Sequence, residues 1–200
     1  MIDMVETLKN YRKKLKLAWV TLPEISISPK LIRGVMINDI VPENDTDDFY
    51  ASVNGGYFKS IATIFEKVNY PFGSMEELLD QGVYITSAVK VKKAGKPLSD
   101  ETIRAHSELL EKELTLFPNL EVVILNGDIA IQAFNEITKR NTGKSLIPEG
   151  EEKVIKDSSY TYGGLTVMPS YHLIDRHKEK NSEAIEQIAK DINTMFSVIK

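Results

Sequence analysis

The sequence predicts an α/β fold, a three-layer α/β/α sandwich around a central, mainly four-stranded parallel sheet. Short apolar, β-branched segments alternate with segments of helical period, and this order places helices over both faces of a parallel sheet. The predicted strands are apolar at consecutive positions, as expected of strands buried on both faces. The chain has 200 residues, of which 42% are hydrophobic, which is enough for one well-filled core. We therefore expect a single domain over residues 1–200.

The first expected elements are a helix, a strand and a second helix. Residues 3–16 have an amphipathic pattern that predicts a helix, and RGVMIND (33–39) is a short apolar run bounded by polar residues, which predicts a strand. Residues 55–68 are expected to form a helix, because four apolar side chains recur at spacings of three, four and three: Phe58, Ile61, Phe65 and Val68.

The next pair is the second strand and the most clearly marked helix. VYITSAV (83–89) is rich in β-branched residues and follows Gly82, which predicts a strand. The segment 97–117 begins with Ser99 as the expected N-cap and has acidic residues in its first turn. One face of this helix then repeats apolar residues, namely Ile103, Leu109, Leu110 and Leu114.

The remaining elements complete the alternation. EVVILNG (121–127) predicts the third strand, with four apolar residues in a row, and residues 128–143 predict a helix that ends at a glycine. The glycine pair 163–164 is suited to the turn of a hairpin, and LTVMP (165–169) predicts the fourth strand. Residues 181–199 predict a closing amphipathic helix.

Composition excludes several classes of protein. The chain has no cysteine, which excludes disulfides, thiolate-bound iron–sulfur clusters, cysteine nucleophiles and zinc sites of the cysteine type. No segment approaches the length of a membrane span, and the N-terminus lacks the pattern of a signal peptide. The net charge of -4 argues against a wholly basic nucleic-acid surface. We expect a cytoplasmic monomer without a metal or cofactor.

Polar residues follow all four predicted strands. In an open parallel sheet, ligands bind beyond the carboxyl ends of the strands, where loops and helix N-termini converge. Asp39 follows the first strand, Ser87 the second and Asn126-Gly127-Asp128 the third, and the fourth leads into Ser170-Tyr171-His172. These side chains are therefore candidates for one shared pocket.

Each candidate also has a structural interpretation. Asp39 caps a turn in many such positions, and a lone histidine after a strand, such as His172, is more often a structural residue than a catalyst. The acidic run ENDTDD (43–48) lacks the glycine and distal glutamate of a calcium loop. The spacing of His172, Asp175 and His177 fits no motif of metal ligands. The sequence thus favours no metal site.

Two lysine- and arginine-rich segments follow the second and fourth strands. VKVKKAGK (89–96) has four lysines, and DRHKEK (175–180) has an arginine, two lysines and a histidine. Each alone is typical of a solvated loop. At the same sheet edge as an aspartate and a histidine, in an otherwise acidic protein, they indicate a ligand that carries phosphate.

The ordered motifs resemble the uracil-DNA glycosylase superfamily, and most closely its family 4-like branch without the iron–sulfur cysteines. The resemblance rests on an acid- and proline-containing loop that leads to an aromatic residue after the first strand. It also rests on VYITSAVKVKK after the second strand, EVVILNGDIA at the third and VMPSYHLIDRH at the fourth. It runs from about residue 33 to the C-terminus and implies the fold predicted above.

The resemblance also implies an activity and roles for individual residues. Such enzymes flip a nucleotide out of DNA and cleave its N-glycosidic bond through an oxocarbenium-like state. Asp39 would position water, with Glu43, Asp45 or Asp47 as alternative acids, and His172 would stabilise charge on the base oxygen. The expected base contacts are Phe49 or Tyr50, by stacking, and Ser87. The expected DNA contacts are Lys90, Lys92, Lys93 and Ser170, with Leu173 or Arg176 as a wedge in the base stack.

Three hypotheses of function remain open at this point. The first is a glycosylase, or a related hydrolase of N-glycosidic bonds, acting on uracil or another deaminated base. The second is an inactive module that binds nucleic acid or a nucleotide. It is favoured by Ser87 and Leu173, which stand where the family usually has asparagine and proline. The third is an unrelated α/β hydrolase that uses Asp39 and His172 on a small phosphorylated substrate.

Overall fold

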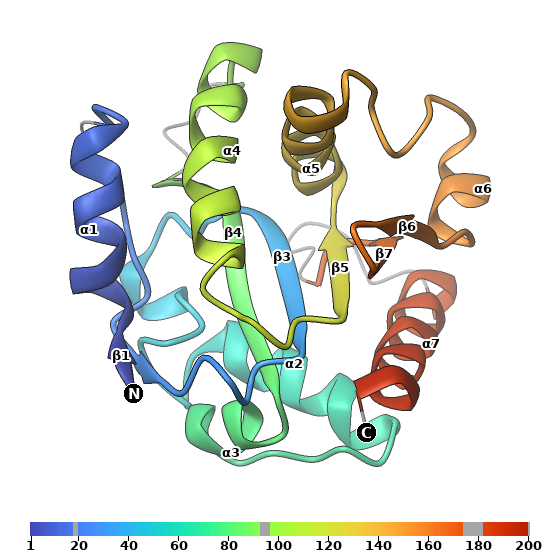
Figure 1. Ribbon diagram of the computed structural model, residues 1–200. Coiled ribbons are helices and arrows are strands. Elements are labelled where there is room, and N and C mark those ends of the chain that lie inside the picture. Colours follow the sequence, from blue (N-terminus) through green and yellow to red (C-terminus); the bar gives the residue numbers. More distant parts are fainter. Residues whose placement is uncertain (18–19, 93–96, 174–181, 200) are drawn as a thin grey trace.

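A five-stranded sheet forms the centre of the protein, in the order β4-β3-β5-β7-β6 (Figure 1). The computed structural model describes residues 1–17, 20–92, 97–173 and 182–199. The neighbouring strands β4, β3, β5 and β7 are parallel, and β6 joins β7 in an antiparallel pair at one edge. The strands are β3 (Gly34–Val41), β4 (Val83–Lys92), β5 (Val122–Asn126), β6 (Tyr160–Tyr162) and β7 (Leu165–Ser170).

Helices cover both faces of the sheet, which confirms the predicted three-layer α/β/α class (Figure 1). One face packs against α1 (Met4–Lys14), α4 (Asp100–Leu114) and α5 (Asp128–Thr142). The other face packs against α2 (Gly56–Lys67) and α7 (Ser182–Ile199). Alternate strand residues serve the two faces: Val35 and Ile37 belong to the first core, and Met36 belongs to the second.

Local signals in the sequence place several of these element ends. The Ser99 side chain accepts a hydrogen bond from the backbone N–H of Thr102, as expected of the N-cap of α4. Gly143 ends α5 in the left-handed conformation, at a φ of 79°. The turn between β6 and β7 is formed by Gly163 and Gly164, both with positive φ, so the expected hairpin is present.

The structure adds short elements that the sequence pattern did not predict. These are α3 (Met75–Asp80), α6 (Glu152–Lys156), the 3-10 turn η1 (Asp45–Asp47) and a small sheet of β1 (Ile2–Asp3) and β2 (Ser26–Ile27). Helices of five or six residues are too short to show a helical period, which explains why the pattern missed α3 and α6. Among the described residues, no helix is long and apolar enough to cross a membrane.

A row of polar residues crosses the carboxyl ends of four strands in register. Asn38 of β3 pairs with Ser87 of β4 on one side and with Asn126 of β5 on the other, and Asn126 pairs with Ser170 of β7. Residues in register on parallel strands project to the same face of the sheet. This polar row therefore continues the face covered by α2 and α7, directly beyond its apolar core.

Candidate active site

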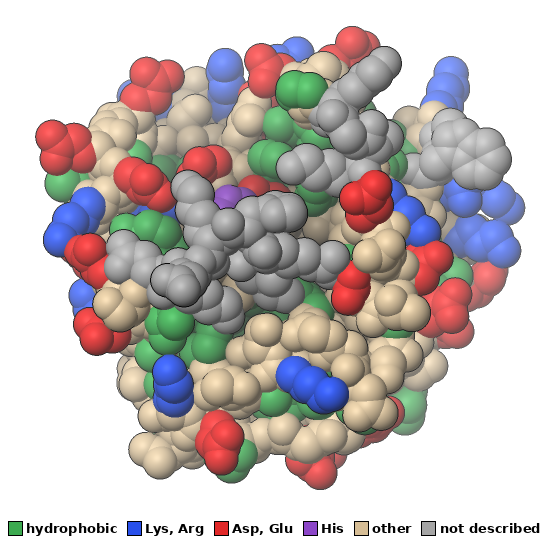
Figure 2. All heavy atoms as spheres, turned by 180° about the vertical axis from the view of Figure 1, so that it is seen from behind, with side chains coloured by type: hydrophobic (Ala, Val, Ile, Leu, Met, Phe, Trp, Pro, Cys, Tyr) green, Lys and Arg blue, Asp and Glu red, His purple; other side chains and the backbone are tan. Residues whose placement is uncertain are grey.

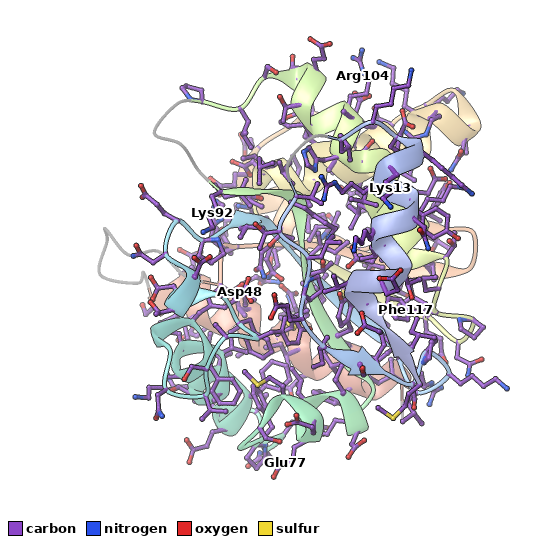
Figure 3. The ribbon with its side chains drawn as sticks, turned by 90° about the vertical axis from the view of Figure 1, so that its left-hand side faces the viewer. Lys13, Asp48, Glu77, Lys92, Arg104 and Phe117 are labelled. Carbon is purple, nitrogen blue, oxygen red and sulfur yellow. The ribbon has the colours of Figure 1, made fainter. Side chains whose placement is uncertain are left out.

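A cavity of about 870 Å³ lies at the carboxyl ends of the strands. It is lined by residues from the exits of β3, β4, β5 and β7, so the expected convergence of the four exits is present. Seven of the predicted site residues line it: Asp39, Phe49, Tyr50, Ser87, Lys90, His172 and Leu173. Figure 3 labels two positions near this end of the sheet, Asp48 in the loop after β3 and Lys92 at the end of β4.

Asp39 is a buried carboxylate between the N-terminus of α5 and His172. Its Oδ1 accepts a hydrogen bond of 2.8 Å from the backbone N–H of Ala130, in the first turn of that helix. Its Oδ2 lies 3.5 Å from Nδ1 of His172, whose side chain is half-exposed. Burial raises the pKa of the Asp39 carboxyl above its usual 3.8, although the nearby His172 and the Ala130 N–H act to lower it.

Gly127 makes the close approach of Asp39 and His172 possible. It has a φ of 120°, which side chains rarely tolerate. A Cβ atom here would lie 2.5 Å from both Oδ1 of Asp39 and Cε1 of His172. The position therefore requires glycine, both for its backbone and for the space. The sequence signal was a glycine between a buried strand and a helix.

The other carboxylates considered for positioning water lie in the loop after β3, and each has different surroundings. Glu43 is exposed and lines the cavity, whereas Asp45 forms an ion pair with Lys92, with 2.5 Å between Oδ1 and Nζ. Asp47 accepts a hydrogen bond from the side chain of Asn44. Of the acids considered for positioning water, Asp39 is the one that the structure brings to His172.

The loop after β3 also brings aromatic rings to the cavity. Phe49 is almost fully buried and stacks on Phe58, with 5.5 Å between the ring centroids. The Tyr50 hydroxyl donates a 2.7 Å hydrogen bond to the carbonyl of Ile85 and accepts one of 3.1 Å from its N–H. This hydroxyl therefore ties the loop to β4. Tyr57 of α2 is a third aromatic residue in the wall, which the sequence analysis did not identify.

The prediction that Lys90 contacts DNA is wrong. Its side chain is 1% exposed, and its Nζ lies 2.6 Å from Oε2 of Glu113, a buried carboxylate of α4. The same Nζ donates to the hydroxyl of Thr86 and the carbonyl of Ser87. The strand β4 continues to Lys92, and along it Lys90 points inward to α4 while Lys92 remains partly exposed.

Two further predictions at the exit of β7 are also wrong. Ser170 is fully buried, and its hydroxyl donates a 2.5 Å hydrogen bond to Oδ2 of Asp191 in α7, so it does not meet a phosphate. Leu173 is 2% exposed and packs in the core between the sheet and α7, so it does not serve as a wedge. In register with Asn126, Ser170 faces the helix layer and not the solvent.

Four of the remaining residues named from the sequence lie outside the described residues, among them Asp175, which was considered with His172 as a metal ligand. Lys93 and Arg176 are the two expected DNA contacts among them, and His177 was considered as a metal ligand. Within the ranges that the structure describes, no three histidine or acidic side chains are grouped as metal ligands. Figure 2 shows acidic and basic side chains interspersed over one face of the molecule.

Asn38 was missed as a site residue, although it is a polar residue that follows an apolar run in its strand, whereas Asn126 was expected at the exit of the third strand but was given no role. Both line the cavity, and Asn126 is fully buried. An asparagine at the end of an apolar strand is visible in the sequence alone. It indicates a candidate site, because burying an amide costs more free energy than burying an apolar side chain at the same position.

The site therefore combines a buried carboxylate, a half-exposed imidazole, aromatic rings and buried amides in one cavity. No curated protein matches the chain. The family model of the uracil DNA glycosylase superfamily matches residues 34–193, a range that contains every strand of the central sheet and all the residues of the cavity named from β3 to His172. The chain belongs to the uracil DNA glycosylase superfamily.

Proposed function

We propose that this protein is a DNA glycosylase that cleaves the N-glycosidic bond of a flipped-out uracil or other deaminated base. The observation that carries the proposal is the pairing of Asp39 with His172 at the sheet edge of a chain of this superfamily. This hydrolysis needs a carboxylate that positions water and an imidazole that stabilises charge on the base, and both groups line the cavity. Phe49 or Tyr50 would stack on the base, and Ser87 would contact its edge.

The chemistry follows from the charge that develops as the bond breaks. The bond between C1′ of the sugar and the base nitrogen breaks, its electron pair stays on the base, and the sugar becomes an oxocarbenium-like cation. Water attacks C1′ and gives its proton to the Asp39 carboxylate, whose negative charge also stabilises the cation. His172 would donate a hydrogen bond from a ring N–H to the oxygen of the departing base, which stabilises the negative charge that develops there.

Fewer lysines remain as proposed contacts with DNA than the sequence suggested. Lys92 has a side chain that is 41% exposed beside the cavity, paired with the exposed Asp45. A surface ion pair of this kind contributes little and can exchange its partner for a phosphate. Lys92 therefore remains a proposed phosphate contact, together with Lys93 and Arg176 from the sequence.

Cleavage of defined oligonucleotides tests the proposal. Single- and double-stranded DNA with uracil, hypoxanthine or xanthine is incubated with the protein, and abasic sites are revealed by alkaline strand cleavage. We expect cleavage of at least one substrate. We also expect Asp39→Asn and His172→Ala each to lower the single-turnover rate by about 100-fold or more, the usual effect of losing a positioned polar group in the transition state.

Asp80→Asn is a matched control, since Asp80 is exposed at the end of α3, away from the cavity. It should leave the rate unchanged. The absence of abasic sites from every substrate would contradict the proposal. If cleavage occurs but both site variants keep the wild-type rate, these residues have no part in the mechanism.

An inactive binding module is the second candidate, and Ser87 is the residue that favours it. A serine offers a single hydroxyl to the edge of a base, whereas an amide offers both a donor and an acceptor. In this case the protein would bind DNA with an affinity that falls steeply with salt, and it would release no base. Binding that does not respond to salt would contradict this alternative.

A further inference from the structure

A run of positive charge occupies the C-terminal half of α1 and the residues just after it. Five cations lie within eight residues, and no acid is among them: Lys9, Arg12, Lys13, Lys14 and Lys16. The whole chain has 29 acidic residues against 25 lysines and arginines, so the charge of this segment is opposite to that of the protein. We call these five residues the α1 basic segment.

The lysines of the α1 basic segment are exposed and lack close acidic partners. This holds for Lys9, Lys13, Lys14 and Lys16 alike. Among the residues that the structure describes, Lys13, Lys14 and Lys16 form no ion pair, and Nζ of Lys9 lies 3.9 Å from the Glu6 carboxylate. An exposed pair at that distance contributes little to stability. These four charges are therefore available to an anion outside the protein.

The helix dipole explains only part of the α1 basic segment. Cations in the last turn of a helix stabilise it, and Arg12, Lys13 and Lys14 occupy the last turn of α1. Lys9 lies before this turn and Lys16 lies beyond the C-cap, where the effect of the dipole is small. The run of charge is therefore longer than the stability of the helix requires.

The apolar face of α1 is already used by the core of the protein. Met4 and Leu8 are fully buried, and Tyr11, Leu15 and Leu17 pack against the same core. A helix that binds a membrane surface inserts its apolar face into the lipid, whereas in α1 these side chains are held in the protein. The α1 basic segment therefore fits a partner that is recognised by negative charge alone, which is what the phosphates of DNA offer.

The α1 basic segment ends close to the cavity. α1 starts beside β1, at the end of the molecule where the strands begin, and runs toward their carboxyl ends (Figure 1). Thr21 lines the cavity, and its N–H donates a 2.8 Å hydrogen bond to the carbonyl of Lys90 in β4. The five chain steps from Lys16 to Thr21 span at most roughly 18 Å. Figure 3 shows Lys13 in the same half of the molecule as Lys92, the last residue of β4.

We propose that the α1 basic segment is a DNA-binding surface that holds backbone phosphates next to the nucleotide in the cavity. The inference takes DNA as the partner from the proposed function and adds a surface to it, because α1 precedes residues 34–193, the range that the family model matches. Nucleotides follow one another by about 3.4 Å along each strand of a duplex, so phosphates within about five nucleotides of the flipped one are in reach. Phosphate contacts carry no sequence information, so this surface raises affinity for DNA without selecting the base.

The salt dependence of DNA binding tests the assignment without a need for turnover. The probe is a labelled duplex of about 25 base pairs with a central tetrahydrofuran analogue of an abasic site, and its dissociation constant is measured over a range of salt concentrations. Lys13→Gln with Lys16→Gln removes two phosphate contacts, so we expect the slope of log Kd against log salt concentration to fall by about 2. At about 0.1 M salt, binding should weaken by roughly 10-fold or more.

Lys67→Gln with Lys112→Gln is the matched control. These two lysines are also exposed and lie in the last turns of α2 and α4, so their loss changes the net charge and the helix dipoles in a similar way. The control should keep the wild-type slope. An equal fall of the slope in both double variants would show a general effect of net charge and would overturn the assignment.

The absence of cysteine from the chain allows a second test, of position. Lys13→Cys introduces a single thiol, which forms a disulfide with DNA that carries a thiol tether on one backbone phosphate. We expect the highest yield with the tether within about five nucleotides of the abasic analogue. Lys112→Cys, in the last turn of α4, should give little product with the same set of DNAs. A yield from Lys13→Cys that does not depend on the place of the tether would contradict a fixed contact beside the cavity.

The outcomes separate this inference from the proposed function. If the wild type cleaves deaminated substrates and Lys13→Gln with Lys16→Gln keeps the wild-type salt slope, the function stands and the assignment to α1 is wrong. If the slope falls as expected but the wild type releases no base from any substrate, the DNA-binding surface is supported and the glycosylase function has failed. If the wild type instead sediments with vesicles of phosphatidylserine and phosphatidylcholine through Lys13 and Lys16, the segment binds membranes and the assignment to DNA is overturned.

Discussion

The exits of β3, β4 and β5 lie on one edge of the sheet, but their buried polar groups differ in how fully they are paired. At β4, the Glu113 carboxylate accepts from the hydroxyls of Tyr84 and Thr86, at 2.8 and 3.0 Å, and pairs with Lys90 at 2.6 Å. At β3 and β5, Asp39 has a raised pKa and Asn126 has an unpaired oxygen.

The contrast separates polar groups that are satisfied within the fold from those, such as Asp39, that we propose a ligand to complete. In the network at β4, which we call closed, the buried charges of Lys90 and Glu113 are paired with each other and with neighbouring hydroxyls. Such a network favours one defined arrangement of the chain, in which each member depends on the others. An under-partnered group costs stability and is retained where a ligand completes it. Burial alone, which Lys90 and Asp39 share, does not distinguish the two roles. Lys90 has a buried carboxylate 2.6 Å away, whereas burial raises the pKa of Asp39 despite its contacts with the Ala130 N–H and His172.

Breaking the closed network should have the largest effect of the changes considered. Lys90→Met removes the cation and leaves the Glu113 carboxylate buried without compensation. We expect the free energy of unfolding to fall by about 3–5 kcal/mol, as measured by urea denaturation. Lys92→Met, at the partly exposed lysine two residues later, should change it by less than about 1 kcal/mol.

A second variant shows whether the loss comes from the uncompensated charge. The double substitution Lys90→Met with Glu113→Leu removes both charges, and we expect it to recover a large part of the stability. If Lys90→Met and Lys92→Met had the same unfolding free energy, the polar network at β4 would contribute nothing to the stability of the fold.

The fold and part of the site could be predicted from the sequence, whereas the position of Lys90 could not. Periodicity was sufficient for the four parallel strands and their large helices, and the topology of a parallel sheet then brought Asp39, Ser87 and His172 to one cavity. Lys90 was misplaced because a basic run reads as a surface loop, whereas β4 continues to Lys92. The carboxylate that accounts for its burial, Glu113, is 23 residues away along the chain in α4, and one sequence contains no signal for such a pairing.

The residues of β5 and β7 illustrate a second limit of the sequence. Asn126 and Ser170 are neighbours in register, and both are polar residues at the end of an apolar strand. Only their hydrogen-bond partners separate them: the Ser170 hydroxyl donates to Asp191 of α7, while Oδ1 of Asn126 has no hydrogen-bond partner among the described residues. Local patterns thus predict where polar groups gather, and long-range packing decides which of them are satisfied.

Asp191 is an intermediate case, because it has hydrogen-bond partners yet is costly to ionise. It accepts from Ser170 and from Nε2 of Gln187, at 2.5 and 2.9 Å, and burial raises its pKa to about 6. Its pKa of 3.8 in the unfolded chain is lower. The unfolded state therefore releases this proton first, and the contribution to stability is present below about pH 4 and is lost as the pH rises through 6.

Asp191→Asn should remove this loss, because an amide stays neutral at every pH. At pH 8 we expect the variant to be more stable than the wild type by on the order of 2 kcal/mol, with the difference shrinking to near zero by pH 4. Thermal or urea unfolding across this range measures it, with Asp80→Asn as the exposed control. A difference that does not change between pH 4 and 8 would show that Asp191 ionises equally easily in both states.

Asp39→Asn should change the free energy of unfolding least of the three substitutions, and in the opposite direction to Lys90→Met. Its pKa is also raised by burial, so the ionised carboxylate destabilises the folded state as the pH rises above the unfolded value of 3.8. Asparagine keeps an oxygen for the Ala130 N–H and offers an NH2 group to His172. We expect the unfolding free energy at pH 7 to rise by on the order of 1 kcal/mol, while cleavage falls by about 100-fold. If Asp39→Asn instead lost several kcal/mol, as Lys90→Met should, the carboxylate would belong to the framework of the protein, and the division between closed and open polar groups at this sheet edge would not hold.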